Sequence, residues 1–256
     1  MTIIKIFFLV ALFPTLVWCQ EETQMNKIGG GTFVPLYDSD SSGVTVSAFL
    51  LDVYPVTNQQ YLDYVKAKPK WQRSKVVRLF ADASYLIKWE SDTVLGAAIN
   101  PNAPATSVSW YAAKEYCACL ENRLPTLNEW EYVAMASETK PNAQNDSIFN
   151  LKIIGSYETP KTYRKNVGST YKNYWGIYDM HGLVWEWTQD FNTVMISGES
   201  RKDVDTDKDL FCGSASINAT NLKDYAAFMR YAFRGSIEAN YSILNLGFRC
   251  AKTIKK

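Results

Sequence analysis

The sequence predicts one compact domain of the α+β class with little regular secondary structure. Helix starts are clear in the first half of the chain, after Thr57, Ser109 and Thr126. Beyond Ser137 the helical periodicity is poor, aromatic residues, Gly and Asn are frequent, and apolar runs are short, which indicates short strands joined by long packed loops. No Pro/Gly/Ser-rich linker, repeat or low-complexity tract divides the sequence.

Two of these helix starts carry the capping-box pattern. In "VTNQQY", Thr57 is followed three residues later by Gln60, and "PTLNEWEYVA" repeats the arrangement with Thr126 and Glu129. Between them, "SWYAAKEYCACLENR" places Ser109 at the cap of a further helix. All three segments are therefore expected to be helical.

The first 19 residues have the layout of a secretory signal peptide. One lysine precedes an apolar run from Ile6 to Val17, and the chain turns polar directly after Cys19. The run is too short for a transmembrane helix, and no later run is long enough. We therefore expect residues 1–19 to be removed and residues 20–256 to form one exported, periplasmic domain without a transmembrane segment. "LVWC" loosely resembles a lipoprotein cleavage box, so lipidation of Cys19 is an alternative.

The charge balance gives no sign of a polyanionic partner. The full chain has a formal net charge of +1, and loss of the single lysine in the leader makes the remainder neutral. A neutral chain without a basic block offers no electrostatic reason to expect nucleic acid or a membrane surface as a partner.

The cysteine count favours disulfides, because an exported chain with an even number of cysteines normally pairs them. The four cysteines beyond the leader are Cys117, Cys119, Cys212 and Cys250. Cys117 lies on the apolar stripe of its expected helix and faces the core, whereas Cys119 leans away from it. Cys212, in "LFCGSAS", is open to use as a nucleophile, a copper ligand or half of a disulfide, and compartment favours a disulfide or a buried thiol.

Several metal chemistries are excluded by ligand count. With His181 as the only histidine and no CxxC pair, the chain has too few ligands for zinc, haem or histidine-bound iron, and His181 is expected to be structural. "DVDTDKDL" places aspartates at the first positions of an EF-hand, but Lys208 and Ser214 replace its glycine and glutamate. We interpret this segment as a solvated acidic loop.

The segment "DMHGLVWEWTQD" is the strongest candidate for a site. Asp179 and Glu186 are hard oxygen ligands, and the turn at Gly182 can present backbone carbonyls to the same point, which is calcium chemistry. An equally weighted alternative is a tryptophan-rich core segment whose Glu186 pairs with an arginine, because a buried carboxylate needs a partner of either kind.

Five motifs in order then resemble a known family. They are "GGGTFVPL", "LDVYPVTNQQYLDYV", "APATSVSWYAAKEYCACLENRLPTLNEWEYVA", "GIYDMHGLVWEWTQDF" and "LGFRCA". From about Lys27 to Ala251 the chain resembles the formylglycine-generating-enzyme, or sulfatase-modifying-factor, domain. The resemblance implies a compact α+β fold related to C-type lectins, and a disulfide between Cys117 and Cys250.

The resemblance also implies a calcium site. Its ligands would be the side chains of Asp179 and Glu186 with the backbone carbonyls of Gly182 and Val184. Calcium would then be a structural cofactor that fixes this loop.

The resemblance breaks at the family's catalytic end. Formylglycine-generating enzymes bind copper through two cysteines upstream of an Arg-x-x-x-Arg pattern, which matches Arg230 and Arg234 here. The two cysteine positions hold Asn221 and Ala226. Neither supplies a thiolate, so formylglycine oxidation is not expected. We assign the arginines, with Arg249, to buried ion pairs with carboxylates such as Glu186 or Glu131.

Three functional hypotheses remain. "MHGLVWEW", "LFCG" and "YAAFMRYAFR" look most like the nitrite reductase accessory (NirV-like) subgroup, which favours an accessory or maturation factor for a periplasmic metalloenzyme. The second hypothesis is an oxidoreductase with a relocated thiol or copper site at Cys212, with Cys119 as the other candidate catalytic residue. The third is a lectin-like module that binds peptide or glycan, with "WQRSKVVRLF" along its groove.

Overall fold

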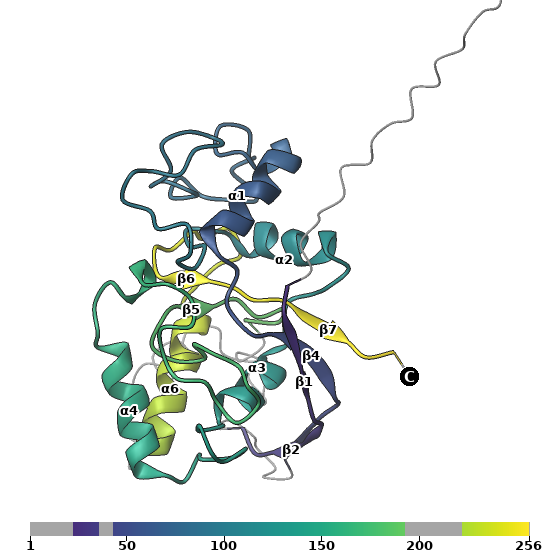
Figure 1. Cartoon of the computed structure of the whole chain (residues 1–256), viewed down its shortest axis with the longest axis vertical. Coiled ribbons are helices and arrows are strands. Elements are labelled where there is room, and N and C mark those ends of the chain that lie inside the picture. Colours follow the sequence, from purple (N-terminus) through teal and green to yellow (C-terminus); the bar gives the residue numbers. More distant parts are fainter. Residues whose placement is uncertain (1–22, 36–42, 193–221, 256) are drawn as a thin grey trace, which may run out of the picture.

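The computed structural model describes residues 23–35, 43–192 and 222–255, and it combines short helices with short strands and long loops (Figure 1). The mixed architecture agrees with the α+β class expected from the sequence. Among the described residues, no helix is both long and apolar enough to cross a bilayer.

The strands form three small sheets. The first has the order β1-β4-β7, all antiparallel, so the central strand pairs with segments from both ends of the described chain. The second is an antiparallel pair of β2 and β3, and the third is a parallel pair of β5 and β6. The strand bounds are Met25–Ile28 (β1), Gly31–Phe33 (β2), Val44–Val46 (β3), Phe49–Asp52 (β4), Trp185–Glu186 (β5), Leu246–Gly247 (β6) and Ala251–Thr253 (β7).

The helices are short and surround these sheets. Their bounds are Asn58–Ala67 (α1), Trp110–Cys119 (α2), Leu127–Ala134 (α3), Ser147–Tyr157 (α4) and Leu222–Gly235 (α6), with 3-10 turns at Pro69–Trp71 and Thr162–Arg164. Figure 1 shows α4 and α6 packed side by side on one side of the molecule, and the β1-β4-β7 sheet on the other.

The three predicted helix starts are confirmed. The Thr57 side chain accepts the Gln60 N–H, and the Gln60 side chain accepts the Thr57 N–H at 2.9 Å, which completes the capping box of α1. The same reciprocal pair caps α3 at Thr126. The hydroxyl of Ser109 accepts the Ala112 N–H at the start of α2.

The second half is more helical than its periodicity indicated. In α4, Ile148 and Leu151 are exposed while Phe149 and Ile153 are buried, so the apolar residues do not form one stripe. The N-cap Asp146 starts this helix, because its carboxylate accepts the N–H groups of the first turn. In α6 the buried stripe includes two arginines, and a search for apolar residues at helical spacing therefore overlooks it.

A disulfide joins α2 to the end of the chain. Cys117 and Cys250 are bonded with Cα atoms 5.5 Å apart across 133 residues, as the family resemblance implies. Both are fully buried in the main core, beside a cluster of aromatic rings that includes Tyr61, Tyr116 and Phe248. The pair therefore holds the last strand against the core at a point where regular hydrogen-bond ladders are short.

Candidate functional site

The motif "DMHGLVWEWTQD" passes through the centre of the molecule and contributes β5. Trp187 is fully buried, and its indole N–H donates to the carbonyl of Val108 at 2.9 Å. Asp179 begins the motif with a left-handed backbone, φ 61°, and is also fully buried. The segment is thus a core element whose carboxylates all require partners.

Glu186 pairs with an arginine. Arg249 Nη2 donates to Glu186 Oε1 at 2.7 Å and Arg249 Nε donates to Oε2 at 2.8 Å, a bidentate geometry. The indole N–H of Trp130 donates to Oε2 at 2.8 Å. Both side chains of the ion pair are fully inaccessible to solvent. This contact confirms the sequence-based alternative in which Glu186 pairs with an arginine.

Asp179 has different partners. Its Oδ1 accepts hydrogen bonds from the amide and the hydroxyl of Thr170, each at 2.9 Å, and its Oδ2 accepts the Gly168 N–H. A carboxylate in this position holds the 168–170 loop against the motif. Because Gly168 has a φ of 79°, a residue with a side chain would be strained there, which makes this close approach to Asp179 depend on glycine.

The calcium site that the resemblance implies stays a prediction. Asp179 Oδ2 and Glu186 Oε1 each accept one hydrogen bond, from Gly168 and Arg249, and a carboxylate oxygen has a second lone pair that a cation could take. In the described part of the chain, no group of three or more His, Cys, Asp and Glu residues is placed to hold a metal ion. Gly182 and Val184, whose carbonyls would complete the site, line a cavity beside the motif.

Calcium removal tests whether calcium or Arg249 alone neutralises the carboxylate of Glu186. If Arg249 is the cation that neutralises Glu186, treating the purified protein with a calcium chelator should leave its melting temperature unchanged. Thermal melts with excess chelator and with millimolar calcium measure the difference. A rise of several degrees with calcium, relative to a magnesium control, would show that the ligand set from the resemblance forms instead.

A second buried charge cluster lies behind the cavity. Glu131 of α3 accepts hydrogen bonds from Arg230 Nε at 3.0 and 2.9 Å and from Arg230 Nη2 at 2.7 Å. Arg234 Nη1 donates to the same carboxylate at 2.8 Å, and its guanidinium lies 4.5 Å from the centre of the Trp130 ring. The predicted ion pairs of these arginines are thereby confirmed.

The two guanidiniums set the ionisation of Glu131. Burial acts to raise the pKa of this carboxyl, but the charges of Arg230 and Arg234 and their hydrogen bonds outweigh it and hold the pKa below its ordinary value. Glu131 is therefore an ionised structural partner and has no proton to donate as a general acid at neutral pH.

His181 is neutral and fully engaged. Its Nε2 donates to the carbonyl of Ala134 at 2.8 Å, so its Nδ1 accepts the hydroxyl proton of Tyr157 at 3.1 Å. Tyr157 in turn accepts from Arg230 Nη1 at 3.3 Å. Burial, together with the positive charge of Arg230, lowers the pKa of His181 to about 3. This histidine positions its neighbours and has no free nitrogen for proton transfer.

The Glu131 cluster yields a stability prediction. Glu131→Gln keeps the size of the side chain but leaves two buried guanidiniums without a full countercharge, so we expect the free energy of unfolding to fall by about 3–5 kcal/mol. Urea denaturation measures it. The control is Glu138→Gln, which removes a pair with Lys152 whose side chains are about half exposed, and it should cost less than about 1 kcal/mol. Equal losses would contradict a special role for Glu131.

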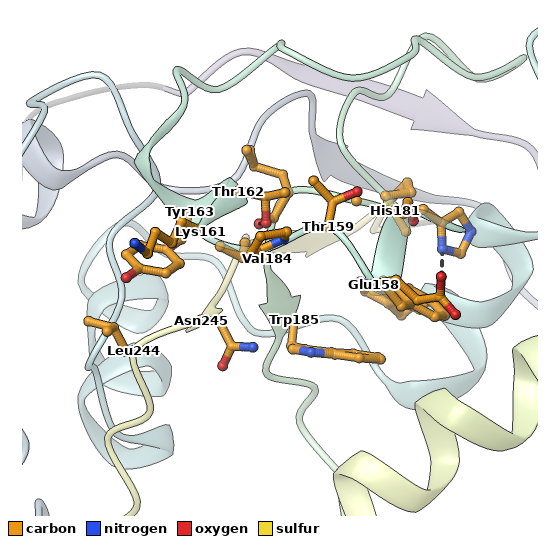
Figure 2. Close-up of a pocket in the computed structure, with 17 residues that line it drawn as sticks. Glu158, Thr159, Lys161, Thr162, Tyr163, His181, Val184, Trp185, Leu244 and Asn245 are labelled. Atoms are coloured by element: carbon orange, nitrogen blue, oxygen red, sulfur yellow. Dashed lines mark hydrogen bonds between the residues drawn. The ribbon is translucent and has the colours of Figure 1, made fainter. Parts of the chain in front are cut away.

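A cavity of about 330 Å³ opens above this cluster (Figure 2). The indole of Trp185 is stacked between Tyr157 and Phe233, with ring centres 4.8 and 4.6 Å apart, so its orientation is fixed. Figure 2 shows the Trp185 ring beside the side-chain amide of Asn245, with Leu244 further along the same wall. A rigid aromatic ring next to polar groups suits ligand binding.

The residue matched to one of the family's copper-binding cysteines is an alanine that lies in the core of this protein. Ala226 lies on α6 with 1% of its surface exposed, and it packs with Ala143, Phe149 and Ile153. The other matched position, Asn221, lies outside the described residues, as do Cys212 and the acidic segment 203–210. At the described position, an apolar contact replaces the thiolate.

Cys119 is disulfide-bonded, and its partner lies outside the described residues. A cysteine held in a disulfide has no thiolate to offer a copper ion or a substrate. The described structure therefore provides no free Cys119 thiol for the relocated-copper hypothesis.

The sequence did not assign Tyr157, Trp130 or Thr170 to the site. Tyr157 and Thr170 lie in the half with weak periodicity, and their roles arise only when α4 and the 168–170 loop meet the motif. Trp130 carried one signal, because "PTLNEWEYVA" places it at the hydrophobic-staple position that follows the cap Thr126. Its contact with Glu186, 56 residues away, has no signature in a single sequence.

These features define a protein of the formylglycine-generating-enzyme class, with an irregular α+β fold, a disulfide between residues far apart in the chain and a tryptophan-rich central motif. A family model described as the sulfatase-modifying factor enzyme 1-like domain matches residues 17–254. The chain belongs to this family.

Relatives of several kinds share the domain. The inactive Cα-formylglycine-generating enzyme 2 of Bos taurus is 25% identical over 289 residues, covering 90% of this chain and 88% of that protein. The formylglycine-generating enzyme of Bos taurus is 26% identical over 283 residues, covering 90% and 74%. The serine/threonine-protein kinase Pkn1 of Chlamydia trachomatis is 27% identical over 256 residues, which are 91% of this chain and only 39% of the kinase.

Similarity extends to solved structures at low identity. The structure of PvdO from Pseudomonas aeruginosa aligns with a TM-score of 0.47 and 19% identity, covering 91% of this chain and 95% of that one.

Proposed function

We propose that this chain is a family member without formylglycine-oxidase activity, and that it serves as an accessory or maturation factor for a periplasmic metalloenzyme such as copper nitrite reductase. The observation that carries the first half is Ala226. At a position where the family's reaction needs a copper thiolate, this chain has a methyl group packed into an apolar cluster.

The cavity beside the motif supports a binding role. Of the titratable residues that line it, His181 is held in hydrogen bonds to Ala134 and Tyr157, whereas Glu158 and Lys161 are exposed at its rim. The cavity presents a fixed Trp185 edge, apolar walls, side-chain amide and hydroxyl groups, and the charged side chains of Glu158 and Lys161. Such a surface recognises a partner or ligand without reacting with it.

The accessory role rests on two further features. The N-terminal leader favours export, and the motifs around Gly182, Cys212 and Arg230 resemble the nitrite reductase accessory subgroup. The similarity to an inactive formylglycine-generating enzyme fits a member that has kept the fold and lost the chemistry.

Two assays on the purified protein and one strain test the proposal. A cysteine-containing sulfatase peptide incubated with the protein and Cu(I) should keep its cysteine, as read by mass spectrometry. Immobilised protein should capture a metalloenzyme from periplasmic extract, and a deletion strain should lose reductase activity. Conversion of the peptide would overturn the first half, and unchanged reductase activity in the deletion strain would overturn the second.

The cavity also supports a second candidate, a lectin-like module for peptide or glycan. Trp185 offers an aromatic edge and Asn245 an amide, the combination that sugar and peptide sites use. Binding on a glycan or peptide array that Asn245→Ala weakens at least tenfold would favour this reading. The control is Asn142→Ala, at an exposed surface position, which should bind like the wild type. No retention of any glycan or peptide would remove it.

A further inference from the structure

Exposed apolar side chains are concentrated in the excursion that follows α1. The amide of Phe80 donates to the carbonyl of Val77 at 2.8 Å, which closes a four-residue turn. The side chains of Val77, Leu79 and Phe80 in this turn are 60%, 69% and 40% exposed. Leu79 and Val77 are among the most exposed large apolar residues of the described chain, whereas the ring of Phe80 packs edge-on against Tyr111 with ring centres 5.3 Å apart.

The turn is built to stay exposed. On its two sides Trp71 and Ala81 are buried in the main core. Arg73 Nη1 donates to the carbonyl of Trp89 at 2.7 Å, and the amide of Ser74 donates to Asp92 at 2.9 Å, which ties the excursion to itself. Because its base is fixed by these contacts, the turn cannot hide its apolar side chains by folding back without breaking them.

Positive charge accompanies the apolar turn. Lys75 and Arg78 flank Val77 and are exposed, and no salt bridge joins either of them to a carboxylate of the described chain. Arg78 Nη1 donates to the carbonyl of Asp82 at 2.8 Å. Hydrogen bonds from Ser74, with a smaller contribution from the charge of Lys75, lower the pKa of the exposed Asp92. The nearest acid along the chain, Asp82, is directed inward, where its carboxylate accepts the amides of Ser84 and Ser242. The overall charge of the protein is near zero, yet this projection is locally cationic.

The composition of the turn distinguishes a bilayer from a protein partner. Protein interfaces concentrate their energy in Trp, Tyr and Arg and are depleted in Lys, whereas Leu and Val contribute little there. Aliphatic and phenyl side chains enter hydrocarbon readily, and lysines beside them bind anionic headgroups. The two most exposed apolar residues, Val77 and Leu79, match the second pattern together with Lys75, and Arg78 and Phe80 are compatible with both.

We infer that the Val77–Phe80 turn binds the surface of an anionic lipid bilayer. Leu79 and its apolar neighbours enter the boundary between headgroups and acyl chains, and Lys75 and Arg78 bind the phosphate groups of the headgroups. The protein would then work at a membrane face, in addition to any function of the central cavity.

Vesicle sedimentation of the full-length chain tests this inference. Wild type should bind vesicles of phosphatidylglycerol and phosphatidylcholine more tightly than vesicles of phosphatidylcholine alone, and salt should weaken the binding. Leu79→Ser should lower the partition coefficient by about tenfold, and the double change Lys75→Gln/Arg78→Gln by about tenfold or more. The N-terminal apolar run is common to all variants, so its contribution is a constant background that is subtracted before the partition coefficients are compared.

The matched control is Ile148→Ser, which removes an equally exposed apolar side chain, 81% accessible, from α4. It should bind like the wild type, and thermal melts should show that every variant is folded. Equal binding by Leu79→Ser and wild type, or equal loss in the Ile148→Ser control, would overturn the inference. So would loss of a captured periplasmic protein in Leu79→Ser with no binding to either vesicle, which would assign the turn to a protein partner.

Discussion

The ion pair between Glu186 and Arg249 is the interaction on which the centre of this structure depends. The guanidinium not only pairs with Glu186 but also donates to the carbonyls of Asp52 and Tyr178 at 3.2 and 3.0 Å. It thereby connects β5, the end of β4 and the loop before the motif. Since both charges are fully buried, loss of either would leave an uncompensated ion in the core. The pair therefore stabilises the segments that surround it and exclude water from it.

Trp130 links this pair to the second charge cluster. Its indole N–H donates to Glu186, and the guanidinium of Arg234 stacks on its ring while pairing with Glu131. Trp130, which lines the cavity, is therefore in contact with both buried charge clusters. Short strands provide few ladder hydrogen bonds, and these polar contacts take over the task of fixing loop positions.

Local signals in the sequence predicted local structure well. The capping residues Thr57 and Thr126 marked helix starts because a cap satisfies amides within three residues of itself. The helical periodicity predicted correctly that Cys117 faces the core, and the family resemblance implied correctly that it pairs with Cys250. The assignment of the arginines to buried carboxylates also held, since an unpaired charge in a core is too costly to persist.

What the sequence could not predict depends on contacts between distant segments. Periodicity missed α4 because its exposed Ile148 and Leu151 break the apolar stripe. The two carboxylates of the motif left a shared cation and an arginine partner equally open. In the structure Asp179 accepts hydrogen bonds from the 168–170 loop and Glu186 from Arg249, and the shared cation stays a prediction. Which partner a buried carboxylate takes is decided by tertiary packing, and a single sequence does not encode it in any local pattern.

The pairing of β4 with both β1 and β7 has a consequence for the order of folding. Arg249, Cys250 and β7 all belong to the last stretch of the described chain, yet they complete the central ion pair, the core disulfide and the first sheet. Contacts of such high sequence separation form late and carry a large loop-closure entropy. During synthesis the N-terminal half therefore cannot complete its native packing until this last stretch has emerged and closed the sheet, the disulfide and the ion pair around it.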